Sequence, residues 1–219
     1  MAHGCTHTEI TKVLTLGECD LHAGSEMQIR NQGHKFDLVI SLTGHSVRKP
    51  VNFRMSSGSL RTFAALNNYA KRKKHTIVID WPDMSAPDLD AEFWQALHAD
   101  LVNFSGRAVI HCLGGHGRTG TALAILAYLD GLTIGQADPV QWVREQYCMS
   151  AVETTSQIEY LRKEIGLVTT AEPSSAYRYE RSTEREPIEG STIGLRKYFD
   201  KAGKFEARNF PTIAADLED

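Results

Sequence analysis

A cysteine and an arginine bracket a glycine-rich segment, His111-Cys112-Leu113-Gly114-Gly115-His116-Gly117-Arg118-Thr119-Gly120. An apolar run at 108–110 precedes it and a mostly apolar run at 122–129 follows it, which predicts a loop between a strand and a buried helix. The first turn of a helix offers unpaired N–H groups and a partial positive charge. Because glycines let the loop amides point inward, the segment predicts a cradle for an anion.

The two reactive side chains of this cradle suit phosphate chemistry. The guanidinium of Arg118 matches two phosphate oxygens. The combined positive field favours the thiolate form of Cys112, which is the nucleophilic form. The competing interpretation is structural, because a cysteine after an apolar strand is often a small buried hydrophobic residue.

The pattern His-Cys, five residues, Arg, then Thr-Gly resembles the signature of the protein tyrosine and dual-specificity phosphatases. Those enzymes hydrolyse phosphate esters through a cysteinyl-phosphate intermediate. The resemblance implies that Cys112 is the nucleophile and that Arg118 binds phosphate without a metal or cofactor. The substrate-binding amides would come from Leu113, Gly114, Gly115, His116 and Gly117.

Two neighbours of the nucleophile receive supporting roles from the same resemblance. Thr119 is expected to donate a hydrogen bond to the sulfur of Cys112. His111 is expected to hold the loop by hydrogen bonds and to favour ionisation of the thiol.

The tripeptide Trp81-Pro82-Asp83 directly follows a strand-like run at 75–80. Cleavage of a phosphate ester requires protonation of the leaving oxygen, and a carboxylic acid on a closing loop supplies that proton. The tripeptide resembles the general-acid loop of tyrosine phosphatases, which implies that Asp83 is the acid. Asp80, at the strand end, and Asp88, an expected helix N-cap, are the competing acids.

The segment 151–161 is similar to one that holds two glutamines near the hydrolytic water in tyrosine-specific phosphatases. Glu153 occupies the first glutamine position, whereas Gln157 matches the second and is a candidate site residue. The plain alternative is that Gln157 is only a polar helix residue. Dual-specificity and other small members of this superfamily often lack the first glutamine, which implies a structural role for Glu153. The chain also lacks the length and the tyrosine-recognition segment of tyrosine-specific domains, which favours the small dual-specificity group. In the polar segment 43–58, Arg48 and Lys49 are either substrate-recognition charges or ordinary solvated charges of an exposed loop.

The apolar periodicity predicts an α/β fold, in which helices flank a central, mostly parallel, twisted sheet of about four to five strands. The resemblance makes this sheet phosphatase-like. Strands are expected at 12–16, 36–42, 75–80 and 108–110. Helices are expected at 60–73, from the Asp88 cap to about 104, from 118 to Gly131, from the Asp138 cap onward, and at 154–165. Residues 1–170 would form the catalytic domain and 171–219 a polar C-terminal extension without its own core.

The overall composition narrows the class of partner. The net charge of -3 over 219 residues does not favour nucleic acid. The four cysteines show no metal or disulfide spacing, and no leader or membrane-length apolar run is seen, so a reduced, cytoplasmic protein without a membrane span is expected. The oligomeric state is not predicted.

The function hypothesis is hydrolysis of phosphotyrosine, with phosphoserine and phosphothreonine as further substrates, in a phosphorylated protein or peptide. Phosphoinositides and RNA 5′-triphosphates are alternative substrates. A catalytically silent phosphate-binding module is the alternative from another class. An intact set of Cys112, Arg118 and Asp83 argues against that module, because binding alone requires neither a thiol nor an acid.

Overall fold

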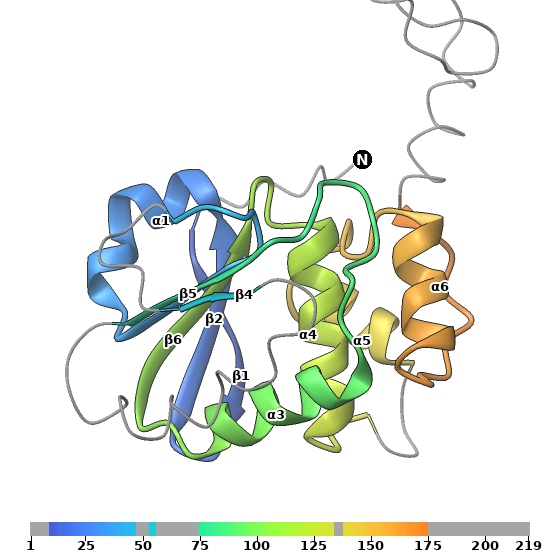
Figure 1. Ribbon diagram of the computed structural model, residues 1–219. Helices are drawn as coiled ribbons and strands as arrows, with labels where there is room; N and C mark the ends of the chain where they lie inside the picture. Colours follow the sequence, from blue (N-terminus) through green and yellow to red (C-terminus); the bar gives the residue numbers. More distant parts are fainter. Residues whose placement is uncertain (1–8, 47–52, 56–74, 134–137, 175–219) are drawn as a thin grey trace, which may run out of the picture. The chain divides into compact units, whose positions relative to one another are not determined.

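The sheet is seen in a computed structural model that describes residues 9–46, 53–55, 75–133 and 138–174 (Figure 1). Within these ranges six strands pair in the order β1-β2-β6-β3-β5-β4. Their bounds are Thr11–Leu16 (β1), Cys19–Ser25 (β2), Leu38–Ser41 (β3), Phe53–Met55 (β4), His75–Ile79 (β5) and Gly106–Cys112 (β6). The strands from β2 to β4 in this order run parallel, and β1 pairs antiparallel with β2. The predicted mostly parallel α/β sheet is confirmed, with one strand more than the expected number.

Helices cover both faces of this sheet. They are α1 (Glu26–Gln32), the 3₁₀ helix η1 (Gly33–Lys35), α3 (Ala91–Val102), α4 (Gly117–Leu129), α5 (Pro139–Gln146) and α6 (Thr155–Lys163). Figure 1 shows α1 on one side of the sheet and α3, α4, α5 and α6 on the other. Helix α4 contacts α3, α5 and α6 as well as β6. This helix therefore lies inside the protein, as its apolar sequence predicts.

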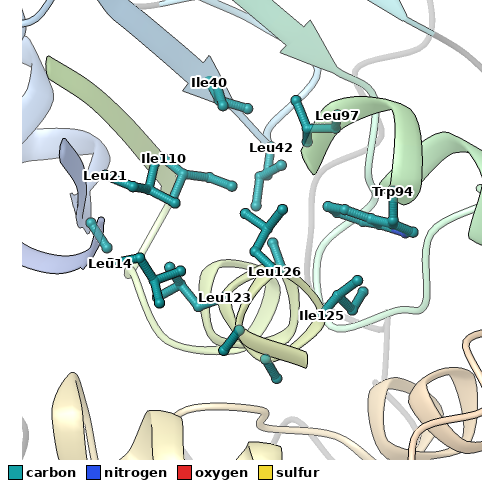
Figure 2. Close-up of a cluster of buried hydrophobic side chains, with 14 of the residues drawn as sticks. Leu14, Leu21, Ile40, Leu42, Trp94, Leu97, Ile110, Leu123, Ile125 and Leu126 are labelled. Atoms are coloured by element: carbon teal, nitrogen blue, oxygen red, sulfur yellow. The ribbon is translucent and has the colours of Figure 1, made fainter. Parts of the chain in front are cut away.

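Strand residues alternate between the two apolar layers. Ile40 and Ile110 face the large core that contains α4, while Val39 and Val109 face the smaller cluster beside α1. Figure 2 shows the α4 side chain of Leu126 among the buried residues of the large core. Because both faces are covered, the central strands read as continuous apolar runs in the sequence.

The helix caps determine where the chain leaves the sheet edge. Asp90 caps α3, and its carboxylate accepts a hydrogen bond from the Phe93 N–H at 2.8 Å. The expected cap at Asp88 is wrong, because the helix begins two residues later and Asp88 remains in the preceding connection. Asp138 caps α5 with Pro139 in its first turn, as predicted.

Two elements at the N-terminal side and one short strand were not predicted. Apart from Leu21, strand β2 carries only small residues at its buried positions, yet it lies between β1 and β6. Helix α1 follows it directly. Strand β4 occupies part of the segment 43–58 that was expected to be a loop. The expected helix at 60–73 lies outside the described residues.

The start of the predicted extension packs on the preceding part of the chain. Ser174 donates from its N–H to Val152 O at 3.0 Å and from its hydroxyl to Ser150 O at 2.8 Å. Arg144 donates to Glu172 O at 2.6 Å. Residues 175–219 lie outside the described part. Among the residues that are described, no helix has the length and apolar character needed to cross a membrane.

Candidate active site

The candidate nucleophile lies at the carboxyl edge of the parallel sheet. Cys112 ends β6 and is 3% exposed. Its Sγ accepts a hydrogen bond from the Gly115 N–H at 3.2 Å. Helix α4 starts at Gly117, so the segment between them is the strand-to-helix loop that the sequence predicts. A thiolate at this place would be stabilised by the loop amide and by the N-terminus of α4.

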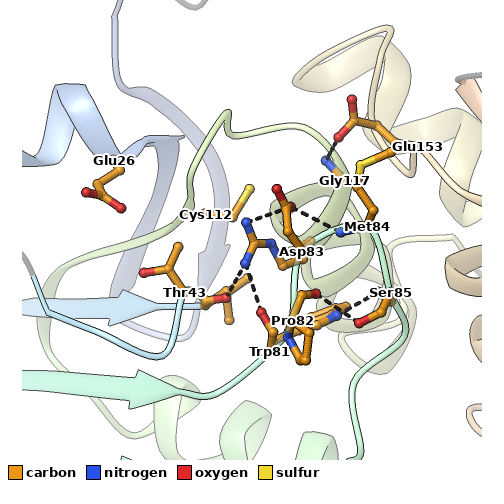
Figure 3. Close-up of polar contacts among 12 residues, drawn as sticks. Glu26, Thr43, Trp81, Pro82, Asp83, Met84, Ser85, Cys112, Gly117 and Glu153 are labelled. Carbon is orange, nitrogen blue, oxygen red and sulfur yellow. Dashed lines mark hydrogen bonds and ion pairs between the residues drawn. The ribbon is translucent and has the colours of Figure 1, made fainter. Parts of the chain in front are cut away.

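Arg118 connects this loop to two other strand ends. Its Nη1 donates to Leu42 O at 3.2 Å, just after β3, and to Trp81 O at 2.8 Å, after β5. Its Nη2 lies 2.7 Å from Asp83 Oδ1 (Figure 3). The Arg118 side chain is 5% exposed. The buried charge is therefore held by two carbonyls and one carboxylate, which leaves it facing the loop in a fixed orientation.

The segment with Trp81 and Asp83 is held in a compact turn. Trp81 Nε1 donates to Ser85 O at 2.8 Å, and the Ser85 hydroxyl donates back to Pro82 O at 2.9 Å. Met84 has a φ of 59°, a left-handed conformation that is uncommon outside glycine. This turn presents the Asp83 carboxylate to Arg118. Figure 3 shows the residues of the turn, from Trp81 to Ser85.

The three candidate acids lie in different places. Asp83 contacts Arg118. Asp80 lies against Gly44, where a Cβ atom would come within 2.5 Å of its carboxylate oxygen. Asp88 lines a groove of about 500 Å³ beside α6. Asp83 is thus the acid that the fold brings to the arginine.

The loop itself combines exposed and closely packed positions. Leu113 and Gly114 are exposed, His116 is half-buried, and Gly115 is buried. Gly115 has a φ of 82°, and a Cβ at this position would lie 2.9 Å from Gly24 O. Glycine is therefore required here both by conformation and by space.

Glu153, just before α6, and Gln157, in the first turn of α6, lie beside Gly117, where the loop joins α4. Glu153 accepts a hydrogen bond from the Gly117 N–H at 3.0 Å. Gln157 Oε1 accepts from the N–H groups of Glu153 at 2.8 Å and Thr154 at 3.2 Å, which forms a capping box. Gln157 is brought next to Gly117, but its side-chain oxygen serves the helix cap.

The side chains that flank Cys112 differ from the expected arrangement. Burial lowers the pKa of His111 to about 4, so the imidazole is neutral at pH 7 and supplies no positive charge to a thiolate. His111 Nδ1 lies 3.4 Å from Cys112 O. The Thr119 hydroxyl is buried without a hydrogen-bond partner. Its expected bond to the sulfur is wrong, because in this geometry the Gly115 amide is the group that donates to Cys112.

His116 lies beside a second cysteine, with its Nδ1 3.1 Å from Cys148 Sγ. Cys148 is disulfide-bonded, whereas Cys19 and Cys112 are free thiols. The expectation of no disulfide is therefore wrong, because pairing depends on proximity in the fold and not on spacing along the chain. Burial raises the pKa of the Cys19 thiol to about 12, which makes Cys19 an unreactive core residue.

Two polar contacts near the loop were missed by sequence reasoning. Glu26 is 6% exposed at the start of α1 and accepts from Arg30 at 2.6 Å and from His45 at 2.9 Å. Burial opposes its charge, but these partners hold the pKa of Glu26 below its usual value. The second contact is the Tyr147 hydroxyl, which donates to Gly115 O at 2.7 Å. No motif marks either residue. Arg48 and Lys49 lie outside the described residues.

The parallel sheet, the loop from Cys112 to Arg118 at its carboxyl edge and the paired Asp83 together define a cysteine-dependent phosphatase domain. Residues 5–175 match the family model described as "PTP-SAK: Swiss Army Knife protein, DSP-PTPase phosphatase domain". This match covers more than half of the 219 residues. The chain belongs to this family of phosphoric monoester hydrolases.

Individual relatives are short or distant matches. Two uncharacterized proteins of Methanocaldococcus jannaschii are 52% identical over 65 residues and 51% identical over 77 residues. These matches cover 28% and 32% of this chain, and 38% and 50% of the relatives. The chain therefore spans half or less of the length of these curated relatives. Among solved structures, Tk-PTP in its active form has a TM-score of 0.48 at 23% identity, covering 74% of this chain and 99% of its own. The Yvh1 phosphatase domain from Chaetomium thermophilum has a TM-score of 0.46 at 16% identity, covering 81% of this chain and 100% of its own.

Proposed function

We propose that this phosphatase hydrolyses phosphate monoesters with Cys112 as nucleophile, Arg118 as the phosphate-binding cation and Asp83 as the general acid. The observation that carries the proposal is the contact between Arg118 and Asp83. It brings an acid from the turn after β5 to an arginine that follows the Cys112 loop. If Cys112 were only a buried structural residue, neither Arg118 nor Asp83 would be needed beside its loop.

The first chemical step is an in-line displacement at phosphorus. The Cys112 thiolate forms an S–P bond while the bond from phosphorus to the ester oxygen breaks. Asp83 transfers its proton to that oxygen, which leaves as an alcohol or phenol. Arg118 and the loop amides stabilise the equatorial oxygens.

The second step regenerates the thiolate. The Asp83 carboxylate accepts a proton from water, whose oxygen bonds to phosphorus as the S–P bond breaks. The products are inorganic phosphate and the Cys112 thiolate, and no external oxidant or reductant is involved. The loop arginine and amides supply the positive charge that a metal ion supplies in kinases.

Unused hydrogen-bond donors in the site support a phosphate ligand. Arg118 Nε is buried without a partner, as is the Thr119 hydroxyl. Buried polar groups in folded proteins are normally paired, so two such groups at the end of the loop that starts at Cys112 favour a ligand rich in acceptor oxygens. Phosphate has this chemistry, and it would take over donors of Arg118 that now serve Asp83.

The proposed substrate is phosphotyrosine in a protein or peptide, with phosphoserine and phosphothreonine as further substrates. Leu113 is 58% exposed in the loop and Met84 is 51% exposed beside Asp83. Exposed apolar side chains near the site suit the ring of phosphotyrosine. The loop contributes no lysine for a multiply charged inositide. A cytoplasmic location and a domain of residues 1–170 followed by a polar extension remain parts of this proposal.

The test is hydrolysis of an aryl phosphate by the wild-type protein, Cys112→Ser and Cys19→Ala. We expect turnover by the wild type and by Cys19→Ala, whose thiol lies in the core, and none by Cys112→Ser. A wild type without turnover, or Cys112→Ser with full turnover, would exclude this mechanism. A panel with a phosphotyrosine peptide, a phosphoinositide and an RNA 5′-triphosphate then tests the proposed substrate. A preference for the phosphoinositide or the RNA 5′-triphosphate would contradict the assignment of phosphotyrosine.

A further inference from the structure

Gly115 contacts the nucleophile through one of its backbone groups and a tyrosine through the other. Its N–H donates to Cys112 Sγ at 3.2 Å. Its carbonyl accepts a hydrogen bond from the Tyr147 hydroxyl at 2.7 Å. Tyr147 comes directly after α5 and has no part in the steps described above. Gly115 therefore links the Tyr147 hydroxyl to the Cys112 sulfur through two hydrogen bonds.

The conformation of Gly115 needs external support. A glycine with a φ of 82° has more conformational freedom than any other residue, so its own backbone does not hold the N–H toward the sulfur. The backbone of Gly24 limits movement on one side, since a Cβ on Gly115 would come within 2.9 Å of Gly24 O. The Tyr147 hydroxyl provides a directional contact to the carbonyl.

Tyr147 is itself well placed to act as a fixed donor. Its N–H donates to Val143 O at 2.9 Å at the end of α5. Arg144 of the same helix donates to Ala151 O at 3.1 Å, which fixes α5 to the next segment. Burial, and then the charge of Cys112, raise the pKa of Tyr147. The phenol therefore keeps its proton and remains a donor over the working pH range.

We propose that Tyr147 is a positioning residue for the nucleophile: its hydroxyl orients Gly115 so that the Gly115 N–H stabilises the Cys112 thiolate. This inference rests on the proposed function, in which Cys112 is the nucleophile, and adds a residue outside the loop that sets its reactivity. Removal of the hydroxyl would leave the fold and Arg118 in place while weakening one hydrogen bond to the sulfur.

The experiment measures the rate at which iodoacetamide alkylates Cys112 as a function of pH. Cleavage after Arg107 and Arg118 releases the peptide 108–118, in which Cys112 is the single cysteine, so mass spectrometry follows this thiol alone. Because iodoacetamide reacts with the thiolate, the midpoint of the rate profile reports ionisation. Loss of one hydrogen bond to a charged sulfur predicts an upward midpoint shift of about one pH unit in Tyr147→Phe.

The matched control is Tyr160→Phe. Tyr160 is also a tyrosine whose hydroxyl donates to a backbone carbonyl, that of Leu89, but it lies on α6 and has no contact with Gly115 among the described hydrogen bonds. Neither substitution changes the charged and titratable groups around the loop, which include Arg118, Asp83, Glu153, Glu26, His45, His111 and His116. We expect the Tyr160→Phe midpoint to match that of the wild type.

The outcomes separate this inference from the proposed function. An unchanged midpoint in Tyr147→Phe, or equal shifts in both variants, would overturn the positioning role even if the wild type is an active phosphatase. A wild type that does not hydrolyse an aryl phosphate would contradict the proposed function, while the alkylation profile still tests Tyr147. In an active enzyme, Tyr147→Phe should move the acidic limb of the kcat/KM profile upward and leave KM nearly unchanged at its optimum. Urea unfolding establishes that both variants are folded under assay conditions.

Discussion

Arg118 Nη2 lies 2.7 Å from Asp83 Oδ1, so the predicted phosphate-binding cation and the predicted acid form one ion pair. The arginine side chain is 5% exposed and the carboxylate 59% exposed. Because the carboxylate is open to solvent, this ion pair is screened more than a fully buried pair would be. A phosphate dianion is therefore able to replace the carboxylate on the arginine, which would free Asp83 to protonate the leaving group.

This competition predicts tighter binding of inorganic phosphate after Asp83→Asn. The neutral amide neither holds Arg118 as strongly nor repels the dianion, so we expect the dissociation constant to fall about fivefold, in proportion to about 1 kcal/mol. Titration calorimetry measures it. Asp88→Asn, at a carboxylate beside α6, serves as the control and should bind phosphate as the wild type does. Weaker binding by Asp83→Asn would show that the carboxylate does not compete.

The same substitution should affect turnover according to the leaving group. Phenyl phosphate needs its oxygen protonated, whereas nitrophenyl phosphate leaves readily as an anion. Loss of a general acid lowers rates by about 10²- to 10⁴-fold, and we expect this loss for the phenyl ester but a much smaller one for the nitrophenyl ester. Steady-state kinetics with both esters provide the comparison. Equal losses would assign the acid to another residue.

Glu153 provides a second negative charge beside the phosphate cradle, because it accepts from the Gly117 N–H at 3.0 Å. Glu153→Gln keeps an acceptor oxygen but removes the charge. We therefore predict a KM for aryl phosphate that is lower by about threefold, which corresponds to a fraction of 1 kcal/mol. Glu159→Gln, at an exposed carboxylate paired with Lys163 on α6, is the control. A KM that rises in Glu153→Gln would mean that the carboxylate supports the loop.

The two adjacent glycines of the loop should respond differently to alanine. Gly115→Ala forces a side chain into a left-handed conformation and against Gly24 O, so we expect a loss of about 1–3 kcal/mol in the free energy of unfolding. A Cβ at Gly114 would meet only the His116 side chain, at 3.2 Å, which can move. Urea unfolding of both variants measures the difference. Similar stabilities would contradict the close packing of Gly115.

Asp100 on α3 predicts a pH dependence of stability. Burial raises the pKa of its carboxyl from 3.8 to about 6, and its Oδ2 is buried without a hydrogen-bond partner. Between these values the folded chain binds more protons at this site than the unfolded chain, so stability falls as pH rises from about 4 to 6. Asp100→Asn should remove this loss and stabilise the protein by about 1–2 kcal/mol at pH 7. Urea unfolding at pH 4.5 and pH 7 tests this, since an equal effect at both would exclude titration of Asp100.

The parts of the site that could be predicted are local in sequence. The loop from Cys112 to Arg118 consists of consecutive residues between two apolar runs, so its strand, turn and helix are visible in the chain. The cap at Asp138 is similarly local. The assignment of Asp88 as a cap was wrong, because Asp88 and Asp90 carry the same side chain and the backbone decides which one meets a helix amide.

The remaining features depend on contacts between distant segments. Strand β2 has little apolar pattern because its buried positions include Cys19 and Ala23, which are small. The missing partner of the Thr119 hydroxyl and the contact of Tyr147 with Gly115 could not be predicted. Both depend on where a side chain points, which the periodicity of a sequence does not describe. Tyr147 directly follows α5 and belongs to no motif in the sequence. Its hydroxyl was the available signal, since a partly buried phenol needs a partner.

The register of the sheet also determines when during folding the proposed nucleophile reaches its site. Ser25 pairs with Cys112, and β6 lies between β2 and β3, so the sulfur reaches its environment only after segments from opposite halves of the domain have paired. Such non-local pairing is slow compared with helix formation. The activity proposed for Cys112 would therefore be available to a newly synthesised chain only once its sheet is complete.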